Sequence, residues 1–203
     1  MTDAARGHST ATLYESSAAT ARACGPELRA AWPAARVAGP AFTVQGIGGD
    51  NLALHRAVAQ APAGSVLVAD LQGARHGHWG EILAVAAQQR GILGLVVDGG
   101  VRDTAEQASL DFPVFARHIT VVGTGKDHPG HLDVPVRVGG AVVHPGDLVV
   151  GDADGVIVVP AEAVAETLDR SDDRVAAEQR ALEAVRAGVT TLEYYRLGRR
   201  KTP

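Results

Sequence analysis

The 203-residue sequence has a single cysteine, Cys24, few aromatic residues (4%) and two lysines, Lys126 and Lys201. One cysteine can form neither an intramolecular disulfide nor the thiolate set of a structural zinc site or an iron–sulfur cluster. So few aromatic side chains argue against a stacking surface for single-stranded nucleic acid. A Schiff-base mechanism would depend on Lys126, because the other lysine lies close to the end of the sequence. We therefore do not favour lysine-based covalent chemistry.

Long hydrophobic runs are also missing. The first ten residues, MTDAARGHST, contain no apolar signal core, and no stretch approaches the roughly 20 apolar residues of a membrane span. The formal net charge is −4 and the isoelectric point is about 6.0, which leaves no excess of positive charge for a phosphate backbone. We expect a cytoplasmic protein that acts on a small molecule and binds neither nucleic acid nor a membrane.

The sequence does contain apolar strands that alternate with Ala-rich helices, followed after residue 112 by consecutive strands. This order predicts an α/β layer fold with a mixed sheet rather than a doubly wound Rossmann domain. We expect one domain over residues 1–203, with a core at about 9–160 and a C-terminal helical arm at 161–198. Helices are expected at 9–24, 52–59, 80–89, 102–109, 161–187 and 191–197, and strands at 37–47, 65–70, 94–98, 112–119, 134–138, 141–143, 147–150 and 156–159.

Glycine-rich loops and histidines give weaker signals. Residues 123–126 lack the upstream glycine and the following Ser or Thr of a Walker loop, and residues 46–49 fail the dinucleotide spacing. Two close histidine pairs could bind zinc, but they lie in Gly- and Pro-rich loops and spacing fixes no third ligand. We favour solvated histidines over a zinc site. These histidines are His76, His78, His128 and His131.

Carboxylates near an arginine give a stronger signal, in the segment 80–103. The first turn of the helix expected there has unpaired backbone N–H groups and a partial positive charge, which suit a substrate carboxylate. Glu81 and Asp103 offer hard oxygen ligands for Mg²⁺ or Mn²⁺, and Arg102 is a permanent cation for an oxyanion. The alternative is a simple turn followed by a favourable charge at a helix start, and the residues alone leave both open.

Glu81 is followed, after twenty intervening residues, by Arg102 and Asp103. This pattern resembles the signature of the RraA-like family, which includes class II pyruvate aldolases acting on 4-hydroxy-4-methyl-2-oxoglutarate and 4-carboxy-4-hydroxy-2-oxoadipate. The resemblance implies a three-layer β/β/α swivelling-domain fold with a long C-terminal helix. It also implies a homotrimer or homohexamer with sites between subunits. Two further segments share the likeness, 36–44 and 145–156.

The resemblance also implies roles for single residues. Asp103 would bind a divalent metal, Mg²⁺ or Mn²⁺, directly, and Glu81 would bind it through water. Arg102 would contact the keto or enolate oxygen of pyruvate. An acidic residue from the C-terminal helix of a neighbouring subunit would complete the metal shell, with Glu178 as our candidate and Glu183 in reserve. Backbone N–H groups would bind the pyruvate carboxylate, those of Gly80, Glu81, Ile82 and Leu83.

The function that this resemblance implies is a divalent-metal lyase that breaks a C–C bond of a 2-oxo acid and releases pyruvate through its enolate. Oxaloacetate decarboxylation passes through the same enolate, so one site could catalyse both reactions. No well-placed His or Lys is evident, so we expect a metal-bound water or hydroxide to be the base. The alternative is a non-catalytic protein that regulates a ribonuclease or helicase, and Glu81 argues against that branch. A lyase or hydrolase of another 2-oxo acid would share the site.

Overall fold

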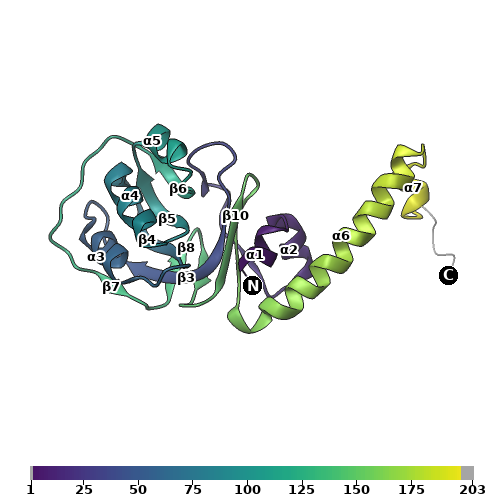
Figure 1. Ribbon diagram of the computed structural model, residues 1–203, viewed down its shortest axis with the longest axis horizontal. Coiled ribbons are helices and arrows are strands. Elements are labelled where there is room, and N and C mark those ends of the chain that lie inside the picture. Colours follow the sequence, from purple (N-terminus) through teal and green to yellow (C-terminus); the bar gives the residue numbers. More distant parts are fainter. Residues whose placement is uncertain (1, 198–203) are drawn as a thin grey trace.

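The computed structural model describes residues 2–197 (Figure 1). The last residue of the expected arm, 198, lies outside this range. The helices are α1 (Thr2–Arg6), α2 (Thr10–Ser16), α3 (Leu52–Gln60), α4 (Glu81–Gln89), α5 (Thr104–Ser109), the 3₁₀ turn η1 (Ala161–Ala163), α6 (Val164–Arg186) and α7 (Thr191–Tyr194). The strands are β1 (Arg22–Ala23), β2 (Arg29–Ala30), β3 (Val37–Gln45), β4 (Val66–Trp79), β5 (Gly94–Val101), β6 (Val114–Ile119), β7 (His131–Leu132), β8 (Val136–Val138), β9 (Ala141–Val143), β10 (Leu148–Asp152) and β11 (Gly155–Val159).

Strand β3 joins two sheet regions because it changes partners along its length. Residues 37–40 pair antiparallel with β10, and residues 41–45 pair in parallel with β4. The parallel order then continues through β5 to β6, and β11 and β1 extend the antiparallel side. Pro40, which has no N–H to donate, lies at the change of partner and does not interrupt the strand.

Alternating side chains along the strands build two cores on opposite faces of the parallel strands. In β4, Leu67 and Ala69 pack with helices α3 and α4, whereas Val66 and Val68 pack with β8, β9, β10 and β11. This period-2 division is what places a helical layer on one face and a β layer on the other. The structure therefore has the expected three-layer β/β/α arrangement, with α3, α4 and α5 together on one side in Figure 1.

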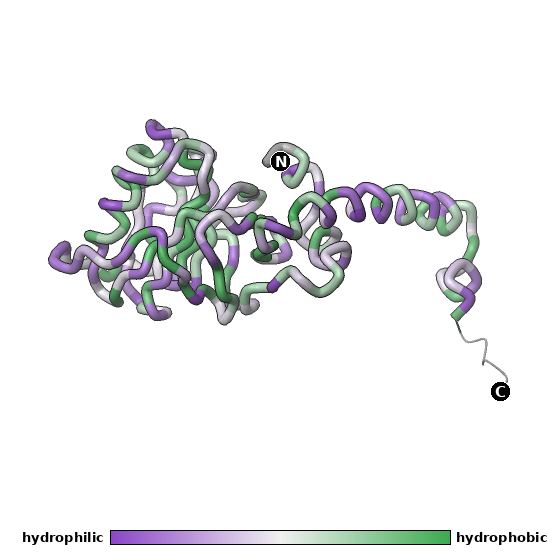
Figure 2. Tube along the Cα trace, turned by 90° about the horizontal axis from the view of Figure 1, so that it is seen from below, coloured by the Kyte–Doolittle hydropathy of each residue, from purple (hydrophilic) through white to green (hydrophobic). Residues whose placement is uncertain are grey.

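A third apolar cluster covers the outer face of β10 and β11. Helices α1 and α2 and the start of α6 pack there, with Leu13 and Val164 fully or almost fully buried. Helix α6 then runs away from the sheets, on the side opposite α3 and α4 (Figure 1). Hydrophilic and hydrophobic residues alternate along it in Figure 2. Among the described residues, no helix has the length and hydrophobicity that a membrane crossing requires.

The prediction of a helix at residues 9–24 is wrong for the second half of that range. Ser9 does cap a helix, since its hydroxyl accepts the N–H of Thr12, but the helix ends at Ser16. Ala18 and Ala19 adopt positive φ, which stops the helix, and the chain then pairs with β11 as β1. The other expected helices and strands are present, but the helix expected at 191–197 ends at Tyr194, and the short strands β2 and β7 were not expected. Strands β4 and β5 continue past their expected ends, at residues 70 and 98, as far as residues 79 and 101.

A partly buried ion pair fixes β5 next to β6, three residues before β5 ends. Arg117 Nε lies 2.5 Å from Asp98 Oδ1, and the backbone N–H of Gly139 donates to Asp98 Oδ2 at 2.7 Å. Burial by itself would raise the pKa of Asp98, but the hydrogen bonds from Arg117 and Gly139 outweigh it and lower that pKa. A further contact of 2.7 Å joins Arg117 Nη1 to Glu27 Oε1. The pair therefore holds the strand end that precedes the candidate site.

Removing the cation of this pair should destabilise the protein. We expect Arg117→Met to lower the free energy of unfolding by about 3 kcal/mol at pH 7, because it leaves Asp98 buried and charged. Arg170→Met, which breaks an exposed pair with Glu166, should cost less than about 1 kcal/mol. Urea denaturation of both variants measures the difference.

The effect of Arg117→Met should also depend on pH. Because the pKa of Asp98 is lower in the folded than in the unfolded chain, the unfolded chain takes up the proton first as the pH falls. The stabilisation is complete above about pH 4, the pKa of an unfolded aspartate, and is lost as the pH falls through the folded pKa. Equal effects of the Arg117 and Arg170 substitutions at every pH would contradict this assignment.

Candidate functional site

A pocket of about 100 Å³ lies where β4 and β5 end and where α3 and α4 begin. In a parallel sheet the carboxyl ends of neighbouring strands meet at one edge, where open α/β sheets bind ligands. Residues from the two strand ends, the two helix starts and the loop after β6 converge there. The lining residues are Asn51, His55, Gly77, His78, Gly80, Ile82, Leu83, Arg102, Asp103 and Lys126.

The Arg102–Asp103 pair occupies the mouth of this pocket directly after β5. The Arg102 N–H donates to Trp79 O at 2.9 Å, which continues the β4–β5 pairing by one residue. Asp103 then adopts the left-handed conformation (φ 54°, ψ 44°), which Asp tolerates better than most residues. This turn places Arg102 Nε 3.6 Å from Asp103 Oδ2, with both side chains partly exposed. The Arg102 guanidinium and the Asp103 carboxylate therefore lie next to each other in the lining of the same pocket.

Two glycines make room for this pair at the end of β4. A Cβ at Gly80 would overlap Asp103 Oδ2 and lie 3.2 Å from Arg102 Cγ. A Cβ at Gly77 would lie 2.9 Å from Thr120 O and 3.2 Å from Arg102 Cδ. The φ of Gly80 is −153°, a value that any residue adopts. Glycine is therefore favoured at position 80 because a Cβ would overlap the Asp103 carboxylate, and not because the backbone there has an unusual conformation.

The N-terminus of α4 meets the carboxylate of Asp103. Glu81 N–H donates to Asp103 Oδ2 at 3.1 Å, so one of the expected free donors is already used. Within residues 2–197, the N–H groups of Ile82 and Leu83 have no protein acceptor. Helix α4 also contributes the partial positive charge of its N-terminus. Of the anion site expected at residues 80–83, only the Glu81 N–H is engaged within the described residues, and the N–H groups of Gly80, Ile82 and Leu83 have no protein acceptor there.

The two carboxylate residues expected to bind a metal, Asp103 and Glu81, are neighbours in the structure. Asp103 and Glu81 are adjacent through the Glu81 N–H hydrogen bond, and the side chain of Glu81 is exposed. No group of three His, Cys, Asp or Glu side chains is placed for a metal within the described part of the chain. Mg²⁺ commonly binds through one or two carboxylates and keeps several waters. The donor set fits such an ion and does not fit a closed zinc site.

The third acidic ligand that the resemblance implies is not near this pocket within one chain. Glu178 lies on α6, the helix that runs away from α4 in Figure 1. Its Oε1 lies 2.8 Å from Arg174 Nε, and Arg174 also forms an ion pair with Glu15 of α2. Glu183, the reserve, is on the same helix. A role for either residue would require a second copy of the chain and stays a prediction.

Two residues with weak sequence signals prove to be structural. His78 is fully buried, its Nε2 accepts Gly49 N–H at 3.0 Å, and its Nδ1 lies 3.3 Å from Gly100 O. Burial lowers the pKa of His78, so the neutral ring holds these two backbone segments together. Burial raises the pKa of the Cys24 thiol to about 12, with a smaller contribution from Asp98, and this favours the protonated thiol.

Two further residues line the pocket: His55, which no sequence motif indicated, and Lys126, which we considered only for Schiff-base chemistry. His55 lies on the first turns of α3, half-buried, and burial followed by the charge of Lys126 lowers its pKa. Lys126 enters from the loop after β6, 23 residues beyond Asp103 in sequence. We expected no well-placed His or Lys, whereas the structure places both His55 and Lys126 in the lining of this pocket. Only the tertiary fold brings these residues to the Arg102–Asp103 pair.

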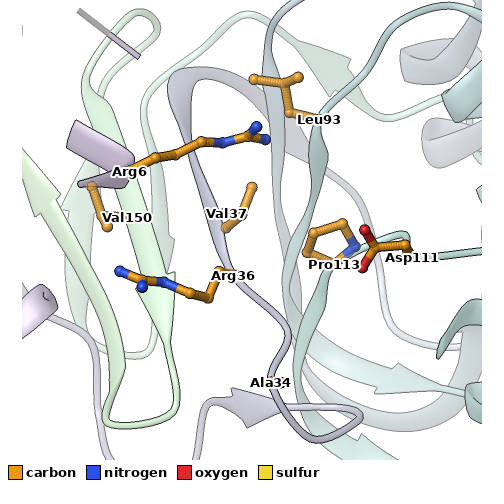
Figure 3. Close-up of a pocket in the computed structure, with 8 residues that line it drawn as sticks. All are labelled: Arg6, Ala34, Arg36, Val37, Leu93, Asp111, Pro113 and Val150. Atoms are coloured by element: carbon orange, nitrogen blue, oxygen red, sulfur yellow. The ribbon is translucent and has the colours of Figure 1, made fainter. Parts of the chain in front are cut away.

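A second, larger cavity of about 350 Å³ lies on another part of the molecule (Figure 3). Arg6 and Arg36 line it, over a floor that includes Val37, Leu93 and Val150. In Figure 3 the two guanidinium groups point in different directions and do not converge on one point. None of the site residues expected from the sequence lines this cavity. The smaller pocket remains the candidate site because its polar groups converge.

Known proteins resemble this chain in sequence and in structure. The family model described as RraA-like, Aldolase/RraA, matches residues 10–158. A protein of Halalkalibacterium halodurans named "Putative 4-hydroxy-4-methyl-2-oxoglutarate aldolase" is 37% identical over 154 residues, which cover 75% of this chain and 73% of that protein. A crystal structure of a protein from Pseudomonas syringae pv. tomato matches with a TM-score of 0.84 and 31% identity, over 93% of this chain and 89% of that one. The structure of the RNA-processing inhibitor RraA from Thermus thermophilis has a TM-score of 0.69 and 30% identity, over 75% of this chain and 93% of that one.

The contact between Asp103 and α4 predicts different effects for two substitutions. Asp103→Ala removes the acceptor of Glu81 N–H and places alanine in the left-handed region, so we expect it to lower the free energy of unfolding by about 2 kcal/mol. Asp103→Asn keeps a carbonyl oxygen for the N–H and tolerates the same φ, so its loss should stay below about 1 kcal/mol. Chemical denaturation measures both, and equal losses would contradict the contact.

Proposed function

The chain belongs to the RraA-like family, and from this membership and the Arg102–Asp103 pocket we propose that it is a lyase that cleaves a C–C bond of a 2-oxo acid and releases pyruvate. One observation carries this proposal. A guanidinium and a carboxylate lie side by side at the mouth of a pocket, next to a helix N-terminus whose Ile82 and Leu83 N–H groups have no acceptor among residues 2–197. The name of the Halalkalibacterium relative supports the same reaction class. The substrates that we propose are 4-hydroxy-2-oxo acids and oxaloacetate.

In this proposal, different residues of the pocket bind different groups of the 2-oxo acid. Its carboxylate binds the N–H groups of Ile82 and Leu83, where the helix N-terminus favours an anion. Its keto oxygen points to the guanidinium of Arg102. This cation stabilises the negative charge that develops on the keto oxygen.

Cleavage then moves one electron pair toward the keto group. The C4 hydroxyl loses its proton, the C3–C4 bond breaks, and its electrons pass to C3 and the keto oxygen as the pyruvate enolate. Addition of a proton at C3 gives pyruvate, and C4 leaves as a carbonyl compound. With oxaloacetate, CO₂ leaves instead and no hydroxyl proton is lost. His55, neutral at pH 7 because its pKa is lowered, is the side chain that we assign to take the hydroxyl proton.

A divalent ion, Mg²⁺ or Mn²⁺, would be held by Asp103 and, through water, by Glu81. When bound, it supplies further positive charge for the developing enolate oxygen. The free carboxylate oxygen of Asp103 is the direct ligand in this proposal, because Oδ2 already accepts the Glu81 N–H. Completion of the shell by Glu178 of a second copy, in a trimer or hexamer, belongs to the same proposal.

A regulatory role is the second candidate, because the Thermus structure is named as an RNA-processing inhibitor. Such a protein would act by binding a ribonuclease or helicase through its surface. It would need neither the Arg102–Asp103 pair nor a metal for that binding. Co-purification of a ribonuclease, unchanged by chelator and by Arg102→Ala, together with no pyruvate release, would favour this role over the lyase.

Pyruvate release from 4-hydroxy-4-methyl-2-oxoglutarate and from oxaloacetate tests the lyase directly. We expect a reaction that requires Mg²⁺ or Mn²⁺ and stops with chelator. Arg102→Ala and Asp103→Asn should each lower the rate at least 100-fold, which corresponds to about 2.7 kcal/mol of transition-state stabilisation. Arg22→Gln, a change of an exposed arginine on β1, is the control and should leave the rate unchanged. Normal turnover in either site variant would refute the assignment.

A further inference from the structure

A fully buried glutamine lies behind the Arg102–Asp103 pair, and the proposed chemistry does not use it. Gln107 is on α5, its exposed fraction is 0%, and it is not among the residues that line the candidate pocket. It borders the apolar core, since its backbone oxygen accepts the N–H of Phe112, a buried core residue. Burial of an amide costs free energy unless the amide is hydrogen-bonded, so a glutamine at this place needs a reason.

The side-chain amide of Gln107 holds the carbonyl group of Arg102. Gln107 Nε2 donates to Arg102 O, and within residues 2–197 no other donor contacts this oxygen. The backbone N–H of Gln107 donates to Asp103 O at 3.1 Å. Gln107 therefore binds both carbonyl groups of the Arg102–Asp103 pair, one through its side chain and one through its backbone.

The turn that Gln107 holds lacks the usual support of a helix start. Asp103 is the residue directly before α5, but its φ is 54° and its side chain forms no capping hydrogen bond to that helix. A residue at this position normally has an extended backbone and accepts an N–H of the first turn. The Asp103 carboxylate instead accepts the Glu81 N–H of α4. Its placement therefore depends on contacts from outside the turn, and Gln107 provides one of them.

The other end of the same amide gives independent evidence for this role. Gln107 Oε1 is buried and has no hydrogen-bond partner among the described residues. An unpaired buried acceptor is costly, and an apolar side chain of the same length would avoid that cost. Packing alone therefore does not favour glutamine at position 107. The bond from Nε2 to the Arg102 carbonyl does.

From these contacts we infer that Gln107 is a positioning residue of the candidate site. By fixing the Arg102 carbonyl, it holds the left-handed turn in which the Asp103 carboxylate meets α4 and lies 3.6 Å from Arg102 Nε. The inference rests on the proposed function for the roles of Arg102 and Asp103. Gln107 acts through these two residues and does not line the pocket itself. A displacement of about 1 Å in such a site can lower a rate on the order of 100-fold.

Gln107→Met tests the inference, because methionine matches glutamine in length, suits apolar surroundings and donates no hydrogen bond. We expect the Glu81 amide hydrogen, measured by NMR, to exchange about tenfold faster or more, since its acceptor is no longer held. Mn²⁺, titrated by electron paramagnetic resonance, should bind about fivefold more weakly or more. At saturating Mn²⁺, kcat for pyruvate release should fall about tenfold or more. KM should change less than about threefold, since the N–H groups of Ile82 and Leu83 are untouched.

Gln88→Met is the matched control. Gln88 is exposed on α4, and its Nε2 also donates to a backbone carbonyl, Leu110 O, at 2.9 Å. It does not line the candidate pocket. This substitution removes the same kind of hydrogen bond at another place, so it should leave the Glu81 exchange rate, the Mn²⁺ affinity and kcat within about twofold of wild type.

Several outcomes would overturn the inference and leave the lyase in place. Unchanged Mn²⁺ affinity and kcat in Gln107→Met would do so, as would equal losses in Gln88→Met. A higher KM with unchanged kcat would indicate a role in substrate binding instead. If Gln107→Met does not fold, Gln107→Leu takes its place, and failure of both to fold would assign Gln107 to folding alone.

A different outcome would refute the proposed function and keep the inference. The Glu81 amide would exchange faster in Gln107→Met and not in Gln88→Met, while the wild-type protein would bind no Mn²⁺ and release no pyruvate. Gln107 would then hold the Arg102–Asp103 turn for another purpose.

Discussion

The carboxylate of Asp103 lies between two positive groups of its own chain, the N-terminus of α4 and the guanidinium of Arg102. This arrangement depends on the left-handed turn at Asp103 and on the missing side chain at Gly80. The parallel pairing of β4 with β5 brings the two segments together, since Trp79 and Val101 are partners at the strand ends. The proposed enolate stabilisation and the proposed metal binding both use the charges that this contact positions.

Much of the fold could be predicted from the sequence because its patterns are local. Ala-rich segments and apolar runs with turn residues between them indicated the parallel strands and their helices, and the three-layer arrangement followed from the family resemblance. The error at residues 9–24 has a physical reason, because helix propensity is a weak preference and the alanines at 18 and 19 adopt positive φ where the chain turns to pair with β11. The dual pairing of β3 involves contacts far apart in sequence, which local patterns do not encode.

The site could be predicted only in part, for the same reason. Glu81, Arg102 and Asp103 lie at strand ends and a helix start, and the family resemblance indicated that they share one site. Lys126 and His55 come from a long loop and from a different helix, and the sequence carries no pattern that joins them. The structure also shows that Asp103 uses one of the expected backbone donors, which leaves fewer for a substrate.

Exchange of the pyruvate methyl hydrogens in D₂O tests the central claim most directly, because it requires formation of the enolate and no other substrate. Loss of a C3 proton and return of a deuteron are followed by NMR as the methyl signal disappears. With the protein and Mg²⁺ or Mn²⁺, we predict exchange far faster than with the ion alone, and a return to the background rate in Arg102→Ala. Exchange at the background rate with the wild-type protein would contradict the claim that this pocket stabilises an enolate.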